Sequence, residues 1–437
     1  MSCRNIPMFV VQISSNFESF HAGVYCFISS LSKSCITYLD RWSRVEETYR
    51  FLNNIEIDHQ KLGLQDLITS MNTSEVDADQ HFKFETIKLI ESNNDRVAVV
   101  CYVPNSIREV HLFVSLLYGS WRHINDNLKS FESIYGIKNH IDLLVFSHPS
   151  VVDHLKVVCN EYNLNRNIFN NQGCYVIEQP FESNIDYGPI NSFIMFNRTD
   201  IYFILESYKY TMRTDYDAFL SPALYFWKPK YNIMTGEGGY SVDFNRNRLK
   251  NISKKLGMKH AGIHNVGSTW LGETKVFITL AKKTLELTSY IYLNEFHPNL
   301  PGLEKLDLQN NIYGQWPTWW RPVSLLYGAE LSLNHLVEDF SESHKGAMDV
   351  PSCSDKSIWE TPHIHCWHNE CEFQKFEFIK HLANIIDKTN TIPGEIAHRM
   401  MENLYEKDVT NMTIMQYSTY IAWNSVGKHL KKYFLED

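Results

Sequence analysis

Short apolar runs alternate with amphipathic stretches between residues 96 and 220. The runs are continuous, which is typical of strands that a parallel sheet buries on both faces. The stretches between them carry apolar residues at helical spacing. This alternation predicts an α/β fold, in which helices flank a mixed, largely parallel central sheet that binds ligands at the carboxyl ends of its strands. The predicted strands are RVAVVCYVP (96–104), IDLLVFSHP (141–149), GCYVIEQ (173–179) and YTMRTDYDAFL (210–220), and the predicted helices occupy 106–121, 150–162 and 189–208.

Polarity divides the chain into three parts. Residues 1–94 have mixed polarity and weak periodicity, which indicates an N-terminal extension. Residues 95–385 are predicted to form the main domain, with halves at 95–224 and 225–385, and residues 386–437 a helical C-terminal segment. The apolar pieces near the N-terminus stop short of the ~18 residues that a membrane span needs, so we expect no transmembrane span. Further helices are expected at 248–257, 273–292, 324–339 and 412–434.

The composition is that of a globular protein, with 44% apolar and 21% charged residues. A net charge of −9 argues against a nucleic-acid binder, which needs a basic face. Aromatic residues make up 14% of the chain, which suits a large core and also carbohydrate recognition. The nine cysteines form no disulfide framework. Cys353, Cys366 and Cys371 are close enough for one local disulfide, and Cys101 fits a strand as a small hydrophobe.

Asp215 and Asp217 stand at the end of the fourth predicted strand, where unpaired charge is unfavourable. Residues two apart in a strand point to the same side, so both carboxylates are expected to converge on one cation. Oxygen ligands favour Mg²⁺ or Mn²⁺, which keep coordination positions open for phosphates. An Asp-x-Asp pair is often only structural, but its place after this strand favours a metal and diphosphate site. Arg213 shares that side and is expected either to pair with Asp215 or to neutralise a diphosphate.

The strands VAVVCYVP and IDLLVFS, the segment YKYTMRTDYDAFLSP and the later HNVGSTW resemble the GT-A glycosyltransferases, which transfer sugars from nucleotide-diphospho-sugars on a Rossmann-like layer. The resemblance covers residues 95–385 and implies a GT-A fold, a Mn²⁺ or Mg²⁺ cofactor and a glycan or glycoprotein acceptor. It implies that Asp217 binds the metal directly. Asp215 would reach the metal through water or hold the ribose. Such enzymes often add a C-terminal histidine to the metal, and His365 in HIHCWH is the preferred candidate.

The same resemblance assigns residues to the rest of the donor. Tyr102, Val103 and Pro104, which end the first strand, would lie against the base, and residues 95–224 would form the nucleotide-binding half. Asn265 and Gly267 would approach the sugar, because glycine permits close backbone contact. The half at 225–385 would bind sugar and acceptor. Retaining and inverting transfer both stay open.

An inverting enzyme needs a carboxylate base, for which Glu295 and Asp307 are candidates, whereas a retaining enzyme needs none. Aromatic rings suit the apolar faces of an acceptor sugar, although the same rings suit a core. The tryptophans that fit either role are Trp270, Trp316, Trp319 and Trp320.

Three alternatives compete with this hypothesis. The chain could be a carbohydrate-binding scaffold without catalysis. It could also be a phosphohydrolase of the haloacid-dehalogenase type, although that family has Thr or Val where Phe219 stands. The segment PHIHCWHNEC could instead form a structural zinc site from Cys366, Cys371 and histidines. Localisation in the Golgi or the lumen of the endoplasmic reticulum follows from the resemblance, with the cytoplasm as the alternative because no signal or anchor is visible.

Overall fold

The computed structural model describes residues 96–430 with short gaps, all within the compact unit that contains Ser92–Asp437. The predicted N-terminal extension, residues 1–94, lies outside the described residues, as does Asp307. The gaps are 136–139, 163–171, 180–184, 226, 228, 230–231, 305, 307, 309–310, 312, 339, 341–347, 367–370 and 387–393.

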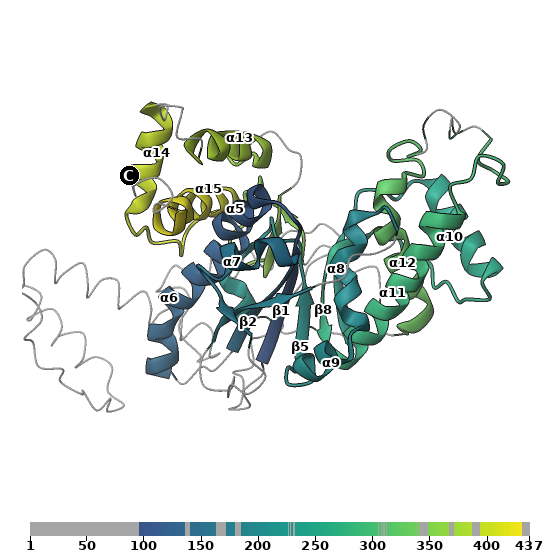
Figure 1. The fold of residues 1–437 in the computed structure, drawn as a ribbon, viewed down its shortest axis with the longest axis horizontal. Helices are drawn as coiled ribbons and strands as arrows, with labels where there is room; N and C mark the ends of the chain where they lie inside the picture. Colours follow the sequence, from purple (N-terminus) through teal and green to yellow (C-terminus); the bar gives the residue numbers. More distant parts are fainter. Residues whose placement is uncertain are drawn as a thin grey trace, which may run out of the picture. The chain divides into compact units, whose positions relative to one another are not determined.

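A seven-stranded sheet forms the centre, in the order β3-β4-β2-β1-β5-β8-β7 (Figure 1). Its first five strands pair in parallel, and β8 pairs antiparallel with both β5 and β7. The predicted α/β class and the mixed, largely parallel sheet are therefore confirmed. The bounds are β1 Arg96–Val103, β2 His140–Ser147, β3 Asn160–Glu161, β4 Cys174–Glu178, β5 Tyr210–Arg213, β7 Ile233–Glu237 and β8 Val266–Glu273.

The fourth predicted strand is shorter than expected. Strand β5 ends at Arg213, so the prediction of a strand to Leu220 is wrong. Asp215 and Asp217 lie in the turn that follows, and the chain resumes as β6 (Phe219–Leu220) in a second sheet of order β6-β10-β9. The other two strands of this sheet are β9 Val350–Pro351 and β10 His363–His365. The two aspartates thus leave the sheet where their charge can reach solvent.

Helices cover both faces of the central sheet. Figure 1 shows α5, α6 and α15 on one side and α8, α11 and α12 on the other. The predicted helices at 273–292, 324–339 and 248–257 correspond to α11, α12 and α10. The helical bounds are α5 Ile107–Ser115, α6 Leu117–Tyr135, α7 Val152–Leu155, α8 Asn191–Ile194, α9 Thr199–Leu205, α10 Asp243–Lys255, α11 Thr274–Asn294, α12 Ser324–Leu336, α13 Lys375–Ile386, α14 Gly394–Leu404 and α15 Ile414–Ser425.

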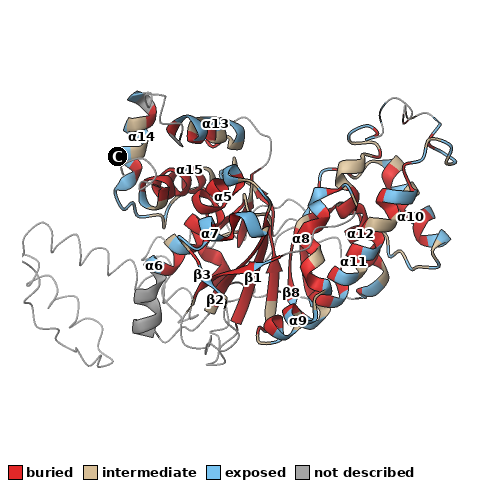
Figure 2. Ribbon diagram, in the orientation of Figure 1, coloured by how far each residue is buried: buried red, intermediate tan, exposed pale blue. Residues whose placement is uncertain are grey.

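The core lies between the sheet and its helices, and Figure 2 shows the central strands β1 and β2 buried along nearly their whole length, whereas the edge strand β3 is exposed. Every residue of β1 is buried, as its continuous apolar run predicts. The C-terminal helix α15 begins with a capping box between Thr413 and Gln416. It packs on α6, where the ring of His123 contacts Tyr417 and Tyr420.

Two disulfides link described cysteines, Cys159–Cys174 and Cys353–Cys371. The second is the local disulfide that the spacing allows, whereas the first was not predicted. Cys101 is buried in β1 as expected, and Cys366 is also buried with a free thiol. The structural zinc hypothesis is wrong in its use of Cys371, because the disulfide occupies that sulfur.

Among the described residues, no helix combines the length and apolarity required to cross a membrane.

Candidate functional site

The candidate site lies where the strand order reverses direction. From β1 the chain proceeds to β2 on one side and later returns to β5 on the other side of β1. The amide of Thr214 donates a 3.0 Å hydrogen bond to the carbonyl of Val100, so Asp215 leaves the sheet directly beside the end of β1. In open α/β sheets, ligands bind at the carboxyl ends of the strands at such a switch point.

Asp215 is held by an arginine and a serine. Its Oδ1 lies 2.8 Å from Nη2 of Arg213, and its Oδ2 accepts a 2.9 Å hydrogen bond from Oγ of Ser268. Burial alone would raise the pKa of Asp215, but Arg213 and His365 lower it below its ordinary value. Nη1 of Arg213 also donates to the carbonyl of Ser268 at 2.7 Å. The predicted pairing of Arg213 with Asp215 is therefore present.

Asp217 pairs with a lysine from a distant part of the chain. Nζ of Lys375, the first residue of α13, lies 2.8 Å from Oδ2 of Asp217. Burial would lower the pKa of Lys375, but Asp217 and more weakly Asp215 raise it, so the ammonium group stays charged. Each aspartate thus has its own cation, and this arrangement offsets the repulsion that was expected to require a shared ion.

The second sheet brings His365 to the aspartates. Strand β10 pairs with β6, whose Phe219 follows Asp217 by two residues. Nδ1 of His365 lies 3.5 Å from Oδ1 of Asp349. Burial would lower the pKa of His365, but Asp349 raises it, with further contributions from Asp215 and Asp217. The predicted histidine therefore lies within the electrostatic reach of both predicted aspartates.

Asp349 is a central residue of the site that sequence reasoning missed. Its side chain is buried, and Oδ1 lies 3.1 Å from Nδ1 of His363. Burial would raise the pKa of Asp349, but His363 and His365 lower it. Nε2 of His363 lies 2.7 Å from Oγ1 of Thr214, so this residue links Asp349 to the segment that carries Asp215. Nothing in the residues around Asp349 marks it in the sequence, because its partners lie on other strands.

Two glycines leave space for Asp349. A Cβ at Gly236 would stand 1.8 Å from Oδ2 of Asp349, and a Cβ at Gly267 would stand 2.5 Å from the same oxygen. Asp349 also has a φ of 60°, which is uncommon for a residue with a side chain. Gly267 therefore packs against the backbone of Gly236 and Glu237 as well as against this buried carboxylate, and its predicted approach to a sugar stays a prediction.

A family profile described as "Domain of unknown function (DUF7164)" matches residues 91–435. This match spans more than half of the chain. The chain belongs to the DUF7164 family. No curated protein matches it.

The predicted base-contacting residues of this DUF7164 chain are unequally exposed. Val103 is fully buried and Tyr102 nearly so, whereas Pro104 is half-buried. Asn265, which was predicted to approach the sugar, has a φ of 64° and donates from Nδ2 to Oε1 of Glu237 at 3.1 Å. Of these four residues, only Pro104 and Asn265 have side chains that solvent partly reaches.

A second cluster lies beside Asn265. His260, His264 and Glu330 place one donor atom each within 4.8 Å of one another, and within the described part of the chain this is the only such group that could hold a metal ion. Asp215, Asp217 and His365 do not meet that distance as they stand. Nδ1 of His264 lies 2.6 Å from Oε1 of Glu330, while Oε2 accepts hydrogen bonds from Tyr240 and the amide of Asn265. Glu330 is thereby satisfied by hydrogen bonds alone.

Glu295, the predicted base, lies at the end of α11. Its carboxylate contacts Arg248 at 2.8 Å and Lys255 at 3.0 Å, and only 3% of the residue is exposed. Two cations therefore hold it, which favours a structural role, and its role as a base stays a prediction.

The four tryptophans divide between core and surface. Trp270 and Trp319 are buried, which assigns them to the core. Trp316 is 48% exposed and stands against Trp320 at 5.3 Å between ring centroids. Only this second pair offers ring faces for an acceptor.

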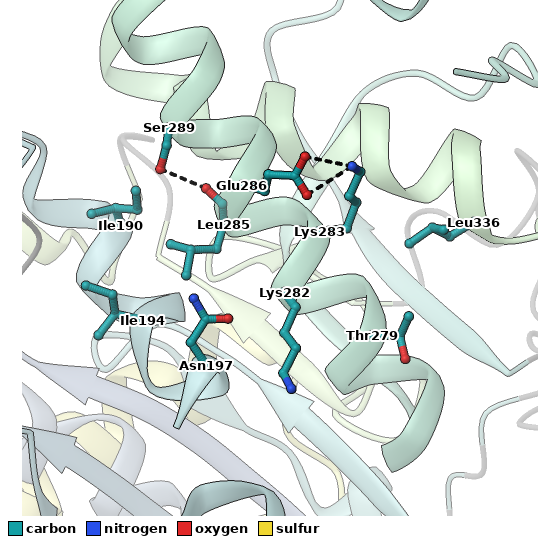
Figure 3. Close-up of a pocket in the computed structure, with 10 residues that line it drawn as sticks. All are labelled: Ile190, Ile194, Asn197, Thr279, Lys282, Lys283, Leu285, Glu286, Ser289 and Leu336. Atoms are coloured by element: carbon teal, nitrogen blue, oxygen red, sulfur yellow. Dashed lines mark hydrogen bonds and ion pairs between the residues drawn. The ribbon is translucent and has the colours of Figure 1, made fainter. Parts of the chain in front are cut away.

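A pocket of about 650 Å³ lies elsewhere, along α11 (Figure 3). Ile190, Ile194 and Leu285 supply its apolar wall, and the ammonium group of Lys283 is paired with Glu286. None of the predicted site residues lines it, so the pocket gives no support to the donor site.

Proposed function

We propose that this DUF7164 protein is a metal-dependent glycosyltransferase of the GT-A type, which transfers a sugar from a nucleotide-diphospho-sugar to a glycan or glycoprotein acceptor. The observation that carries the proposal is the position of His365. The pairing of β10 with β6 brings this residue within electrostatic reach of Asp215 and Asp217, which add to the rise in its pKa that Asp349 causes against burial. Two acids and a histidine from distant segments thus gather at the switch point of the sheet.

The residues present suit a divalent ion. Asp215 and Asp217 offer carboxylate oxygens and His365 an imidazole nitrogen, a donor set that fits Mn²⁺ and, through the oxygens, Mg²⁺. A bound ion would stabilise the charge that develops on the departing nucleoside diphosphate. Arg213 and Ser268 hold the carboxylate of Asp215 in place. The proposal assigns no base, because cations hold Glu295 and retaining transfer needs none.

The sheet order and the disulfides support the proposal at two further points. Parallel strands β1 and β5 end side by side at the reversal of strand order, as in nucleotide-binding α/β sheets. Two disulfides favour an oxidising compartment. This supports the Golgi or the lumen of the endoplasmic reticulum as the proposed location.

One observation favours a second candidate, a carbohydrate-binding scaffold without catalysis. Arg213 and Lys375 already neutralise Asp215 and Asp217, so the aspartates do not need a metal for stability. Such a protein would bind glycans and be stabilised by them without turning over a nucleotide sugar.

Hydrolysis of a panel of UDP and GDP sugars in the presence of Mn²⁺ tests the proposal. We expect the wild type to release nucleoside diphosphate, and Asp217→Ala to lower the rate by about a hundredfold or more. Asp243→Ala is the matched control, because Asp243 is a 95% exposed acid at the start of α10. Equal rates in both variants would exclude the site. Thermal stabilisation by glycans without turnover of any donor would favour the scaffold.

A further inference from the structure

We infer that Lys375 is a built-in cation that holds Asp217 in the ligand-free protein and donates its remaining N–H groups to the pyrophosphate of the donor. The inference rests on the proposed function, since it assigns a residue to the same site. It names the ligand chemistry, a pyrophosphate group, and a residue that the sequence pattern did not single out.

The bonding of Lys375 is incomplete in a way that suits a phosphate ligand. An ammonium group has three N–H donors. Among the described residues, the only hydrogen bond of Nζ is the 2.8 Å contact with Oδ2 of Asp217, while Oδ1 of Asp217 has no hydrogen-bond partner. The side chain of Lys375 is 14% exposed and that of Asp217 is 17% exposed. Spare donors therefore stand in a largely desolvated position at the end of the sheet.

The buried ion pair of Arg96 and Asp142 shows how a purely structural pair is bonded. Asp142 is fully buried, and it accepts hydrogen bonds from Arg96, from the hydroxyl of Tyr208 at 2.9 Å and from the amide of Gly173 at 2.8 Å. Buried structural carboxylates are normally saturated in this way. Asp217 and Lys375 are not saturated, so both keep bonding capacity for a ligand.

The other cation of the site is more deeply buried, since 4% of the Arg213 side chain is exposed, against 14% of the Lys375 side chain. The guanidinium group of Arg213 is engaged by Asp215, by the carbonyl of Ser268 and by Oγ of Ser192, the last at 2.8 Å. Nε of Arg213 has no hydrogen-bond partner among the described residues, but it is buried. Lys375 is thus the cation near the aspartates whose spare donors are the more accessible to a ligand. A lysine ammonium group is charged at neutral pH, so its hydrogen bonds to a phosphate are charge-assisted.

Two consequences follow from this arrangement. Lys375 and a divalent cation compete for the same carboxylate oxygen, so removing the ammonium charge should tighten binding of the cation. The same change should weaken binding of pyrophosphate, because a charge-assisted hydrogen bond is lost. A purely structural ion pair predicts no such opposite effects.

Calorimetric titration of the full chain separates these outcomes. The probes are Mn²⁺ without nucleotide, and pyrophosphate, UDP and GDP in the presence of EDTA. We expect Lys375→Gln to bind Mn²⁺ severalfold more tightly and to bind pyrophosphate and UDP or GDP about tenfold more weakly. Lys375→Arg should retain the anion affinity, because the charge remains.

Lys380→Gln is the matched control, since Lys380 is a 69% exposed lysine of the same helix paired with Glu377. Unchanged anion affinity in Lys375→Gln would overturn the inference. A variant with lower affinity for both Mn²⁺ and the anions and with a lower melting temperature would overturn it as well. A wild type that binds none of the anions would overturn it too. If the anions bind through Lys375 but no nucleotide sugar is turned over, the inference stands and the proposed transferase function fails.

Discussion

Oδ1 of Asp349 lies 3.5 Å from Nδ1 of His365, and this buried carboxylate raises the pKa of the imidazole, with smaller contributions from Asp215 and Asp217. Histidines that bind metals usually donate their second nitrogen to such a carboxylate, which fixes tautomer and orientation. In the proposed metal site, Asp349 would position His365 in this way.

Replacing Asp349 with Asn tests this role. The variant keeps the shape of the side chain but removes the negative charge, so the ring of His365 loses its preferred partner. We expect Mn²⁺ affinity to fall about 10- to 100-fold, measured by calorimetry at neutral pH. Asp142→Asn is the control, since it alters another buried, cation-bound acid. Should both variants keep wild-type Mn²⁺ affinity, Asp349 has no positioning role.

Replacing Gly236 with Ala should destabilise the protein by about 1–3 kcal/mol, the usual effect of overpacking. The new Cβ would stand 1.8 Å from Oδ2 and 2.3 Å from Cγ of Asp349, and a short, buried side chain has little room to move away. Urea unfolding measures the change. At Gly188 a Cβ meets nothing within 4 Å, so Gly188→Ala should leave stability within a few tenths of a kcal/mol. Equal stabilities for the two variants would refute the close packing.

Acidification should weaken the packing of α15 and its C-terminal extension on α5 and α6. Burial lowers the pKa of His123 and of His429 to about 4, with smaller contributions from Lys428 near the first and from Arg122 and Lys428 near the second. His429 packs against Tyr118 with ring centroids 5.1 Å apart. The unfolded chain takes up these protons near pH 6.5, whereas the folded protein takes them up only near pH 4. The stability associated with the two neutral histidines is therefore complete above pH 6.5, and it is lost as the pH falls from 6.5 to about 4.

Urea unfolding between pH 7 and pH 4.5 measures this effect. Each histidine should contribute about 1.4 kcal/mol per pH unit within the window. The double variant His123→Phe with His429→Phe should show a flatter profile, whereas His398→Phe, which alters a 69% exposed histidine of α14, should follow the wild type. A double variant as sensitive to acid as the wild type would show that other groups govern the loss.

Local sequence patterns predicted individual strands and helices of this fold better than they predicted which segments pair with one another. The apolar runs that became β1, β2, β4 and β5 were recognisable, because a strand buried on both faces must be apolar throughout. Strand β8 was missed, because its segment VGSTWLGE contains glycines and polar residues that pack only once β5 and β7 flank it. The disulfide Cys159–Cys174 was missed for a similar reason, since its sulfurs meet through the pairing of β3 with β4.

The sequence by itself determined the α/β class and the position of Asp215 and Asp217 near the carboxyl end of a buried strand, because both depend on residues that are neighbours in the chain. Only the tertiary structure decided which partners those aspartates have. Lys375 reaches Asp217 from the start of α13, Ser268 reaches Asp215 from β8, and His365 approaches both from the second sheet. Their contacts depend on how separate segments pair in space, and hydrophobic periodicity carries no information about such pairing.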